Sequence, residues 1–123
     1  MIIGVGIDIV DIHEIEESLR EEGFQRRVFT VAEMDSVQRY RHQAEHLAGK
    51  FAVKEAFMKA IGAGLGQSVT FTEIETLSEE TGKPYVTIGG EAKERFDNCH
   101  AKQIHASISH ASGVAVAVVI LEG

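Results

Sequence analysis

The stretch best suited to chemistry is 51–64, FAVKEAFMKAIGAG. Its apolar residues recur at helical spacing on almost every side, so the helix that it predicts is largely buried. It nevertheless carries Lys54, Glu55 and Lys59, and a charge at an apolar surface needs a partner or a function. Glu55 and Lys59 lie on one side of the helix, whereas Lys54 lies about 100° round the axis from Glu55. A carboxylate flanked by two ammonium groups suits a metal-bound polyphosphate.

A second carboxylate, Asp8, lies near the start of the sequence within a period-two pattern, which is typical of a half-buried strand. One face of this predicted strand is apolar and carries Ile3, Val5, Ile7 and Ile9. The other face carries Gly4, Gly6 and Asp8. The sequence therefore places Asp8 on the glycine-bearing face of the strand.

The elements that would position these residues begin with an amphipathic helix from about Ile12 to Glu22, which Gly23 is placed to end. Thr30 and Glu33 have the spacing of a capping box and predict the start of a second helix. The longest helix runs from about Ala44 to Ile61. It stops at a run of glycines, for which left-handed backbone costs little: Gly62, Gly64 and Gly66.

The second half of the chain is predicted to be mainly strands. Segments rich in β-formers cover Phe71–Leu77 and Pro84–Ile88, and they form a hairpin. A short helix from about Glu91 to Asn98 precedes a second hairpin, whose strands are Ile104–Ser109 and Gly113–Leu121 and whose turn is His110-Ala111-Ser112. We expect an α+β fold, a mainly antiparallel sheet packed with one long buried helix and shorter helices, as a single domain over residues 1–123.

Composition excludes several classes of protein. The chain has 123 residues, 44% hydrophobic and 25% charged, and no apolar run approaches the ~20 residues needed to span a bilayer, so we expect no membrane segment. The first residues, MIIGVGIDIV, have neither a basic leader nor a small-residue cleavage site, so they are interpreted as a core strand. Cys99 is the only cysteine, which fits a reducing compartment. A cytoplasmic location is expected.

The charge distribution indicates where an anionic ligand would bind. A formal net charge of −7 argues against binding to nucleic acid, which needs a basic face. Residues 11–22 contain six carboxylates and one arginine, whereas residues 24–59 contain seven Lys or Arg and four carboxylates. An anionic ligand should therefore meet the second segment.

Four motifs in order resemble one family. They are GIDIVDI at 6–12, FAVKEAFMKAIGAG at 51–64, GKPYV at 82–86 and SISH at 107–110. Together they resemble holo-(acyl-carrier-protein) synthase, a family of 4'-phosphopantetheinyl transferases. The resemblance covers nearly the whole chain, and the Lys-Glu-Ala element with a lysine four residues after its Glu is fairly specific.

The resemblance implies a fold, an assembly and a reaction. Small members of the family are α+β units that form a homotrimer with active sites at subunit boundaries, and this length implies the trimer. The implied reaction moves the phosphopantetheine arm of coenzyme A to a serine of an apo acyl carrier protein and releases adenosine 3',5'-bisphosphate. Chemistry at the residues agrees, because phosphoryl transfer depends on positioning and on neutralising phosphate charge.

By the same resemblance, Asp8 and Glu55 are the candidate ligands of Mg²⁺, and two carboxylates would leave positions for phosphate oxygens and water. Asp11 is a weaker candidate, since in an ideal strand it points opposite to Asp8. Lys59 would stabilise the leaving diphosphate. Glu55, directly or through a metal-bound water, would be the base for the incoming serine hydroxyl, and the sequence leaves both routes open. Further groups are implied to contact coenzyme A phosphates: Lys50, Lys54, Gly62, Gly64, Ser109 and His110.

Other interpretations use the same residues. Asp8 could cap the helix that begins near Ile12, and Glu55 with Lys59 could form a surface ion pair. The chain could also be a relative that binds coenzyme A or a carrier protein without turnover. A different class is suggested by His42-Gln43-Ala44-Glu45-His46, which has the His-x-x-Glu-His spacing of zinc peptidases, with His42 and His46 on one helical face. A chain of this length could hardly supply the further ligand and the cleft that such an enzyme needs.

Two departures from the family pattern concern the partners. Family members usually offer a basic first helix to an acidic carrier, whereas residues 11–22 are acidic here, so the carrier would use another surface or meet Arg20, Arg26 and Arg27. Lys50 stands where the family often has arginine. It keeps the charge but loses bidentate phosphate geometry.

Overall fold

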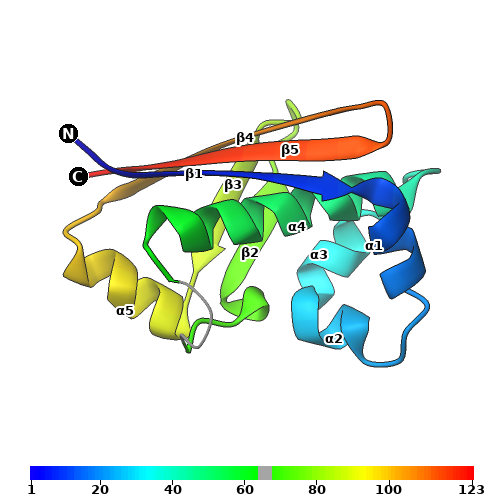
Figure 1. Cartoon of the computed structure of the whole chain (residues 1–123), viewed down its shortest axis with the longest axis horizontal. Coiled ribbons are helices and arrows are strands. Elements are labelled where there is room, and N and C mark those ends of the chain that lie inside the picture. The colour runs from blue at the N-terminus through cyan, green and yellow to red at the C-terminus, as the bar shows by residue number, and fades with distance from the viewer. Residues whose placement is uncertain (64–67) are drawn as a thin grey trace.

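The computed structural model describes residues 1–63 and 68–123, and Figure 1 shows how the elements are arranged. In chain order the elements are β1 (Ile2–Asp11), α1 (Ile12–Ser18), α2 (Phe24–Val28), α3 (Val31–Ser36), α4 (Gln43–Ala60), η1 (Phe71–Glu73), β2 (Ile74–Ser78), β3 (Pro84–Ile88), α5 (Gly90–Asn98), β4 (Gln103–Ala111) and β5 (Val114–Glu122). The α+β architecture with antiparallel sheets and one long buried helix confirms the predicted fold class.

A three-stranded antiparallel sheet in the order β1-β5-β4 lies along one side of α4 (Figure 1). The inner face of β5 is fully apolar and buried, with Ala115, Ala117, Val119 and Leu121 at 0–1% exposure. These side chains meet the apolar face of α4, which includes Ala52, Ala56 and Phe57. The core therefore lies between the sheet and the long helix, as the apolar pattern of 51–64 predicted.

The two glycines of β1 let α4 approach the strand at backbone contact. A Cβ on Gly4 would lie 2.1 Å from the carbonyl oxygen of Ala60, and a Cβ on Gly6 would lie 1.8 Å from that of Ala56. Real Cβ atoms do not come so close, so only glycine fits at either position. Asp8 follows on the same face of the strand and is thereby brought against the next turn of α4.

The remaining helices and the second sheet cover the other sides of α4. Strands β2 and β3 form a separate antiparallel pair with Thr76 opposite Val86. Helices α1, α2 and α3 lie at one end of the molecule, and α5 lies at the other (Figure 1). The capping box predicted for α3 is present, because Glu33 N–H donates to Thr30 Oγ1 at 3.1 Å and Thr30 N–H donates to Glu33 Oε1 at 2.9 Å.

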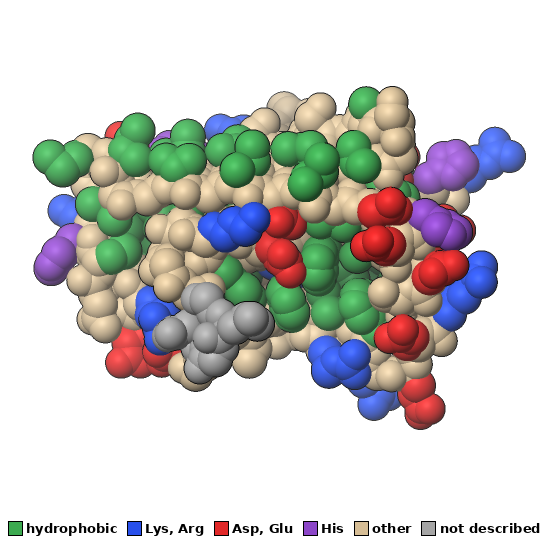
Figure 2. Space-filling model, in the orientation of Figure 1, with side chains coloured by type: hydrophobic (Ala, Val, Ile, Leu, Met, Phe, Trp, Pro, Cys, Tyr) green, Lys and Arg blue, Asp and Glu red, His purple; other side chains and the backbone are tan. Residues whose placement is uncertain are grey.

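The outer face of the three-stranded sheet is apolar and uncovered along β1 and β5, whereas β4 adds exposed polar side chains: His105, Ser107 and Ser109. Its β1 residues Ile3, Val5, Ile7 and Ile9 are 37–64% exposed, and they stand opposite β5 residues in the register Val5–Ile120, Ile7–Val118 and Ile9–Val116. Figure 2 shows a row of hydrophobic side chains along this edge of the molecule. Such a contiguous apolar surface is a feature of interaction sites.

Three predicted boundaries were wrong. Helix α1 ends at Ser18 rather than near Glu22, and Gly23, with φ +87°, begins α2 instead of ending α1. Carboxylates at Glu21 and Glu22 would oppose the dipole at a helix C-terminus, which favours the earlier end. Residues 71–73 form a 3-10 turn rather than a strand, because Glu73 Oε1 accepts the N–H of Thr70 at 2.7 Å and closes the chain there.

The turn of the second hairpin was also predicted two residues too early. Strand β4 continues through His110 and Ala111, and the turn is Ser112-Gly113, with φ of +54° and +81°. Positive φ at both central residues matches the right-handed twist of the flanking strands, and glycine adopts it readily. Among the described residues, no helix combines the length and the apolar content required to cross a bilayer.

Candidate functional site

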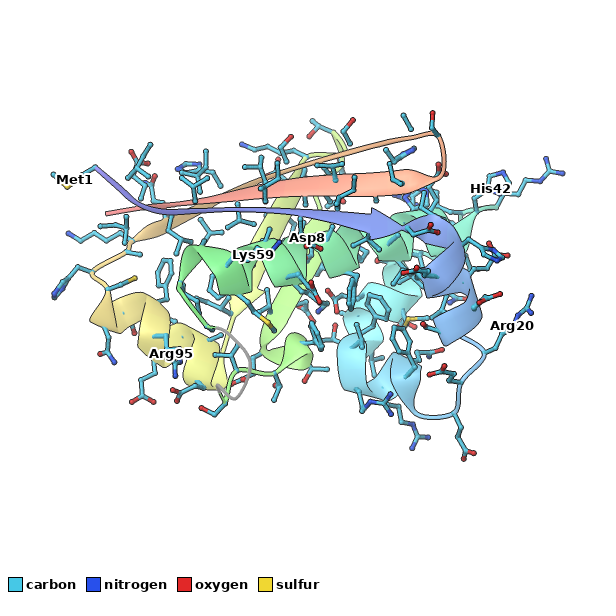
Figure 3. All side chains as sticks on the ribbon, viewed as in Figure 1. Met1, Asp8, Arg20, His42, Lys59 and Arg95 are labelled. Carbon is cyan, nitrogen blue, oxygen red and sulfur yellow. The ribbon has the colours of Figure 1, made fainter. Side chains whose placement is uncertain are left out.

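Asp8 and Lys59 meet between β1 and α4 (Figure 3). Lys59 Nζ donates to Asp8 Oδ1 at 3.1 Å and to the carbonyl oxygen of Ile7 at 3.0 Å. The Asp8 side chain is only 10% exposed, whereas that of Lys59 is 57% exposed. Asp8 Oδ2 is buried, and within the described part of the chain no group donates a hydrogen bond to it. A buried carboxylate oxygen without a donor is costly, so this atom has the environment of a ligand atom.

Glu55 is half-buried beside this pair. Burial raises the pKa of the Glu55 carboxyl, the nearby charge of Asp8 raises it further, and the Lys59 ammonium opposes both effects. A carboxylate whose charged form is disfavoured by a neighbouring carboxylate is a natural site for a divalent cation, which would remove the repulsion. The donor set, two carboxylates with one unpartnered buried oxygen, therefore fits Mg²⁺. Among the described residues, no group of three or more His, Cys, Asp or Glu side chains is placed to hold a metal.

Asp11, the weaker metal candidate, has a structural role. Its Oδ1 accepts the backbone N–H of Glu14 at 3.2 Å and caps α1. The cap that the sequence offered as an alternative role for Asp8 is thus supplied by Asp11. Asp8 is left available for chemistry.

Lys50 lies on a different side of α4, in a cleft of about 660 Å³. It is 6% exposed, and its Nζ donates to the carbonyl oxygen of Thr76 at 2.7 Å. Burial lowers the pKa of the Lys50 ammonium, with the charge of Glu33 opposing and that of Lys54 adding to the effect. An anion in the cleft would be attracted to this poorly solvated cation. Gly82 and Pro84 of the predicted GKPYV motif also line the cleft.

His110 lines the same cleft from β4, and its Nδ1 lies 2.8 Å from Glu45 Oε1. Ser109 does not share that position. Successive residues of a strand point to opposite faces, and Ser109 stands opposite Val116 in the register of the outer face. Ser109 and His110 were predicted to contact phosphates together, from one turn. The structure places their side chains on opposite faces of the sheet.

Lys54 has partners that differ from the phosphate contact expected for it. Its side chain is fully buried and pairs with Glu33, with Nζ 2.8 Å from Oε1. The same Nζ donates to the carbonyl oxygens of Phe71, at 2.9 Å, and Ile74. Burial lowers the pKa of the Lys54 ammonium, while Glu33 raises it. With its three hydrogens directed into the protein, Lys54 ties together α3, α4, η1 and β2, and it does not face a ligand.

The glycines after α4 divide between described and undescribed residues. Gly62 is exposed with φ +75°, and its N–H donates to the carbonyl oxygen of Lys59 at 3.2 Å, as expected where a helix ends. Gly64, the other predicted phosphate contact, and Gly66 lie outside the described residues.

The zinc-peptidase spacing does not produce a metal site. His42 is the N-cap of α4, with φ −110° and ψ 73°, and therefore stands outside the helix that would have aligned it with His46. His46 stacks on Tyr40 with ring centroids 3.7 Å apart. Burial lowers the pKa of His46, and the charge of Glu45 opposes that shift. The prediction of two histidines on one helical face was therefore wrong.

The predicted site residues thus form two clusters on different sides of α4. The carboxylate cluster, defined as Asp8, Glu55 and Lys59, faces β1, and the basic cluster, defined as Lys50 and His110, lines the cleft by β3 and β4. Five residues separate Lys50 from Glu55, which corresponds to about 140° round a helix. One chain does not bring the two clusters together.

Comparison with known proteins places the chain in a family. Residues 4–119 match the model of the 4'-phosphopantetheinyl transferase superfamily. The chain is 40% identical over 124 aligned residues to holo-[acyl-carrier-protein] synthase of Geobacter metallireducens, covering 99% of this chain and 98% of that protein. It is also 40% identical to the synthase of Clostridium tetani, covering 100% and 98%. The chain belongs to the 4'-phosphopantetheinyl transferase superfamily, as the motifs predicted.

Solved structures agree with this assignment. The holo-[acyl-carrier-protein] synthase of Helicobacter pylori, in complex with coenzyme A, is similar with a TM-score of 0.82 and 32% identity, covering 96% of this chain and 99% of that one. The synthase of Bacillus anthracis gives a TM-score of 0.81 and 37% identity over 100% and 98%, and that of Neisseria meningitidis gives 0.87 and 29% over the whole of both chains. The phosphopantetheinyl transferase fold is confirmed.

The sequence analysis gave no tertiary contact to two charged residues that lie near these clusters, Glu45 and Glu33. Glu45 appeared only within the zinc-peptidase spacing, and its partner His110 lies on a strand far along the chain. Glu33 was predicted only as a capping residue, yet its Oε2 accepts the N–H of Thr76 at 2.8 Å and its Oε1 pairs with Lys54. Both contacts depend on tertiary packing, so no local spacing indicated them.

Proposed function

We propose that this protein transfers the 4'-phosphopantetheine group of coenzyme A to a serine of an apo acyl carrier protein and releases adenosine 3',5'-bisphosphate. The observation that carries the proposal is the buried, unpartnered Asp8 Oδ2 beside Glu55 and Lys59. Membership of the superfamily and full-length similarity to holo-[acyl-carrier-protein] synthases support the choice of substrates.

Asp8 and Glu55 would hold Mg²⁺, which when bound neutralises the charge of the diphosphate and polarises its phosphorus–oxygen bonds. Glu55 also suits the role of base for the serine hydroxyl. Its carboxylate is half-buried beside Asp8 and forms no ion pair with Lys59 among the described residues, so it keeps an oxygen for the serine proton. Glu55 would take this proton directly or through a water.

Lys59 would stabilise the leaving group. Its ammonium is 57% exposed, although it already contacts Asp8 and Ile7, so it retains room to donate to a diphosphate oxygen. Negative charge accumulates on the bridging oxygen as the bond to phosphorus breaks, and a fixed ammonium there lowers the barrier. The same group can supply a proton to the leaving phosphate.

The far end of coenzyme A would bind the basic cluster of a neighbouring subunit. The diphosphate is assigned to the carboxylate cluster, so the phosphate left for Lys50 and His110 is the 3'-phosphate of the ribose. The two clusters lie on different sides of α4, and one ligand therefore spans two subunits of the proposed homotrimer. The exposed apolar face of β1 and β5 supports self-association. Ser109, at the edge of that face, and Gly62 stay candidate contacts across the boundary.

The remaining part of the proposal is the surface at which the carrier protein docks. An acidic carrier would be repelled by the exposed carboxylates of α1, and the arginines Arg26 and Arg27 of α2 are exposed nearby. The proposed docking surface is therefore the α2 end of the molecule. A cytoplasmic location and a single domain over residues 1–123 stay predictions.

A mass-shift assay tests the reaction. Purified protein is incubated with coenzyme A, Mg²⁺ and an apo carrier protein, and the carrier should gain the mass of one phosphopantetheine group. Several carriers of different surface charge are used, because the acidic α1 leaves the carrier's identity open. Absence of any adduct while coenzyme A still binds would favour a relative that has lost turnover.

Mixing subunits tests where the sites lie. Glu55→Gln damages only the carboxylate cluster, and a Lys50→Ala, His110→Ala double variant damages only the basic cluster. If each site uses one cluster from each of two subunits, equal mixing after dissociation and reassembly restores about one quarter of the sites. If both clusters of a site come from one chain, the mixture stays inactive.

A further inference from the structure

We infer that Glu45 is a positioning residue that orients His110 toward the 3'-phosphate of coenzyme A. This inference rests on the proposed function, and it adds a residue to which neither the motifs nor the comparisons give a role. Glu45 Oε1 lies 2.8 Å from His110 Nδ1, and both side chains line the cleft that holds Lys50. The pair joins the first turn of α4 to the last residues of β4.

The atoms in contact determine what the imidazole can offer. A carboxylate oxygen only accepts hydrogen bonds, so Nδ1 of His110 carries the hydrogen in this pair. Nε2 lies on the opposite side of the ring. When the ring is protonated, Nε2–H is the one ring donor that remains for an anionic ligand. Glu45 thereby decides which nitrogen of His110 faces the ligand.

The Glu45–His110 pair is accessible to a ligand in the cleft, and each side chain restrains the other. The side chains of His110 and Glu45 are 46% and 32% exposed. Without the carboxylate, an exposed imidazole on a strand would sample several rotamers. Ligand binding would then cost the conformational entropy of fixing one of them. The other charged or titratable groups that line the cleft come from α4, from the α3 side and from two phenols: His46, Lys50, Asp35, Arg39, Tyr40 and Tyr85.

Lys50 and His110 would then act as two fixed donors. The Lys50 ammonium is anchored by the carbonyl oxygen of Thr76 at 2.7 Å, and the His110 ring is anchored by Glu45. Thr76 also lines the cleft, and its Oγ1 is buried with no hydrogen-bond partner among the described residues. A monophosphate needs several donors in a fixed arrangement, which this cluster offers. Adenosine that lacks the 3'-phosphate would gain nothing from it.

Binding measurements on the intact protein test the inference. Calorimetry compares adenosine 3',5'-bisphosphate with adenosine 5'-monophosphate for the wild type, Glu45→Gln, Glu45→Ala, His110→Ala and the Glu45→Gln, His110→Ala double variant. We expect Glu45→Ala to weaken bisphosphate binding about ten-fold and Glu45→Gln less, since the amide oxygen can still accept from Nδ1, while monophosphate binding changes less than about two-fold. The double variant should bind no more weakly than His110→Ala.

A matched control is Glu17→Gln on α1. Glu17 pairs with another exposed histidine, His13, at 3.2 Å, so this variant removes a Glu–His pair outside the cleft. It should leave bisphosphate binding within about two-fold of the wild type. In carrier assays, the Glu45 variants should raise the KM for coenzyme A with little change in kcat, because the 3'-phosphate is remote from the reacting bond.

Three results would overturn the inference. One is a wild type that does not distinguish the two nucleotides. The second is equal weakening of both nucleotides in the Glu45 variants, which would mean that Glu45 only shapes the cleft. The third is additivity of the Glu45 and His110 effects. Failure of the wild type to modify any carrier would instead reject the proposed function, so the two failures are distinguishable.

Discussion

Lys59 donates to the carboxylate of Asp8, 51 positions earlier in the chain, at 3.1 Å. The sequence offered an ion pair of Lys59 with Glu55 in the preceding turn as an alternative, and among the described residues no such pair forms within 4.0 Å. The lysine therefore joins α4 to β1 and leaves the Glu55 carboxylate free of a direct partner from the same helix. Both carboxylates and the ammonium are then available to one phosphate-bearing ligand.

Glu55→Gln should abolish transfer without unfolding the protein. The amide keeps the shape of the side chain but loses the charge for a metal ion and the basicity for a serine proton, and we expect kcat to fall at least about 100-fold. Turnover of coenzyme A with a carrier is measured beside the melting temperature. Glu94→Gln, an exposed carboxylate on α5, is the control and should retain activity. Near-normal turnover of Glu55→Gln would remove Glu55 from the mechanism.

Lys54→Met should destabilise the fold by about 3–5 kcal/mol, because it leaves the fully buried Glu33 carboxylate without its cation. The free energy of unfolding is measured with denaturant. Lys93→Met, which breaks an ion pair with Asp97 that is exposed on both sides, should cost about 0–1 kcal/mol. Equal effects of the two substitutions would contradict the structural role of Lys54.

Gly6→Ala should disrupt the packing of β1 on α4. The new Cβ would lie 1.8 Å from the carbonyl oxygen of Ala56, and neither backbone can move far without breaking the core. We expect a lower melting temperature and a larger relative loss of activity, since the substitution moves Asp8 away from Glu55. Gly89→Ala, where a Cβ meets open space, should cost about 1 kcal/mol or less. A stable and active Gly6→Ala variant would show that this contact does not set the carboxylate spacing.

Ile7→Lys tests the apolar sheet face. Ile7 is 60% exposed in the single chain, so a lysine there should leave the fold of the subunit intact, as circular dichroism can verify. In an assembly that buries this face, the charge would be expensive to desolvate. Analytical ultracentrifugation should show a trimer for the wild type and smaller species for the variant, with activity lost in parallel. A monomeric wild type would reject the proposed assembly.

Acid should weaken the link between η1 and α5. Burial raises the pKa of Glu73, but hydrogen bonds from the backbone N–H groups of Thr70 and Glu91 outweigh it, so the folded-state pKa lies below the ordinary value. The stabilisation is fully present above the unfolded-state pKa and is lost as pH falls through the folded-state pKa. The free energy of unfolding is measured between pH 7 and pH 3 for the wild type and for Glu73→Gln. The wild type should be more stable at pH 7, and the two values should converge toward pH 3. A constant difference across that range would contradict this.

Local patterns predicted much of this fold because they report local physics. The alternation around Gly4 and Gly6 identified the strand and its glycine face, and the apolar run after Phe51 identified the central helix. The capping box at Thr30 was found for the same reason, since both partners lie within one turn. Turn chemistry was less informative. Serine rarely adopts a positive φ, so the sequence did not indicate the value of +54° at Ser112. The hairpin turn was therefore predicted too early in the chain.

Contacts between distant segments could not be predicted from one sequence. Lys54 was assigned to phosphates by the family resemblance, whereas it pairs with a carboxylate on α3. Asp8 and Glu55 were joined by the family resemblance rather than by any spacing, and the backbone contact at Gly6 supplies the physical reason. The separation of the basic cluster from the carboxylate cluster required the helix and the strands to be placed in space.

The buried carboxylate of Glu33 has a consequence for how the chain folds. It caps α3, accepts the N–H of Thr76 on β2 and neutralises Lys54 on α4. Its hydrogen bonds and its ion pair are therefore complete only when these three segments have assembled. A partly assembled intermediate would hold an unsatisfied ion in its interior, which strongly disfavours it. Opening of α3, α4 and β2 should therefore occur as one cooperative unit, with amide hydrogens in all three exchanging at a common rate.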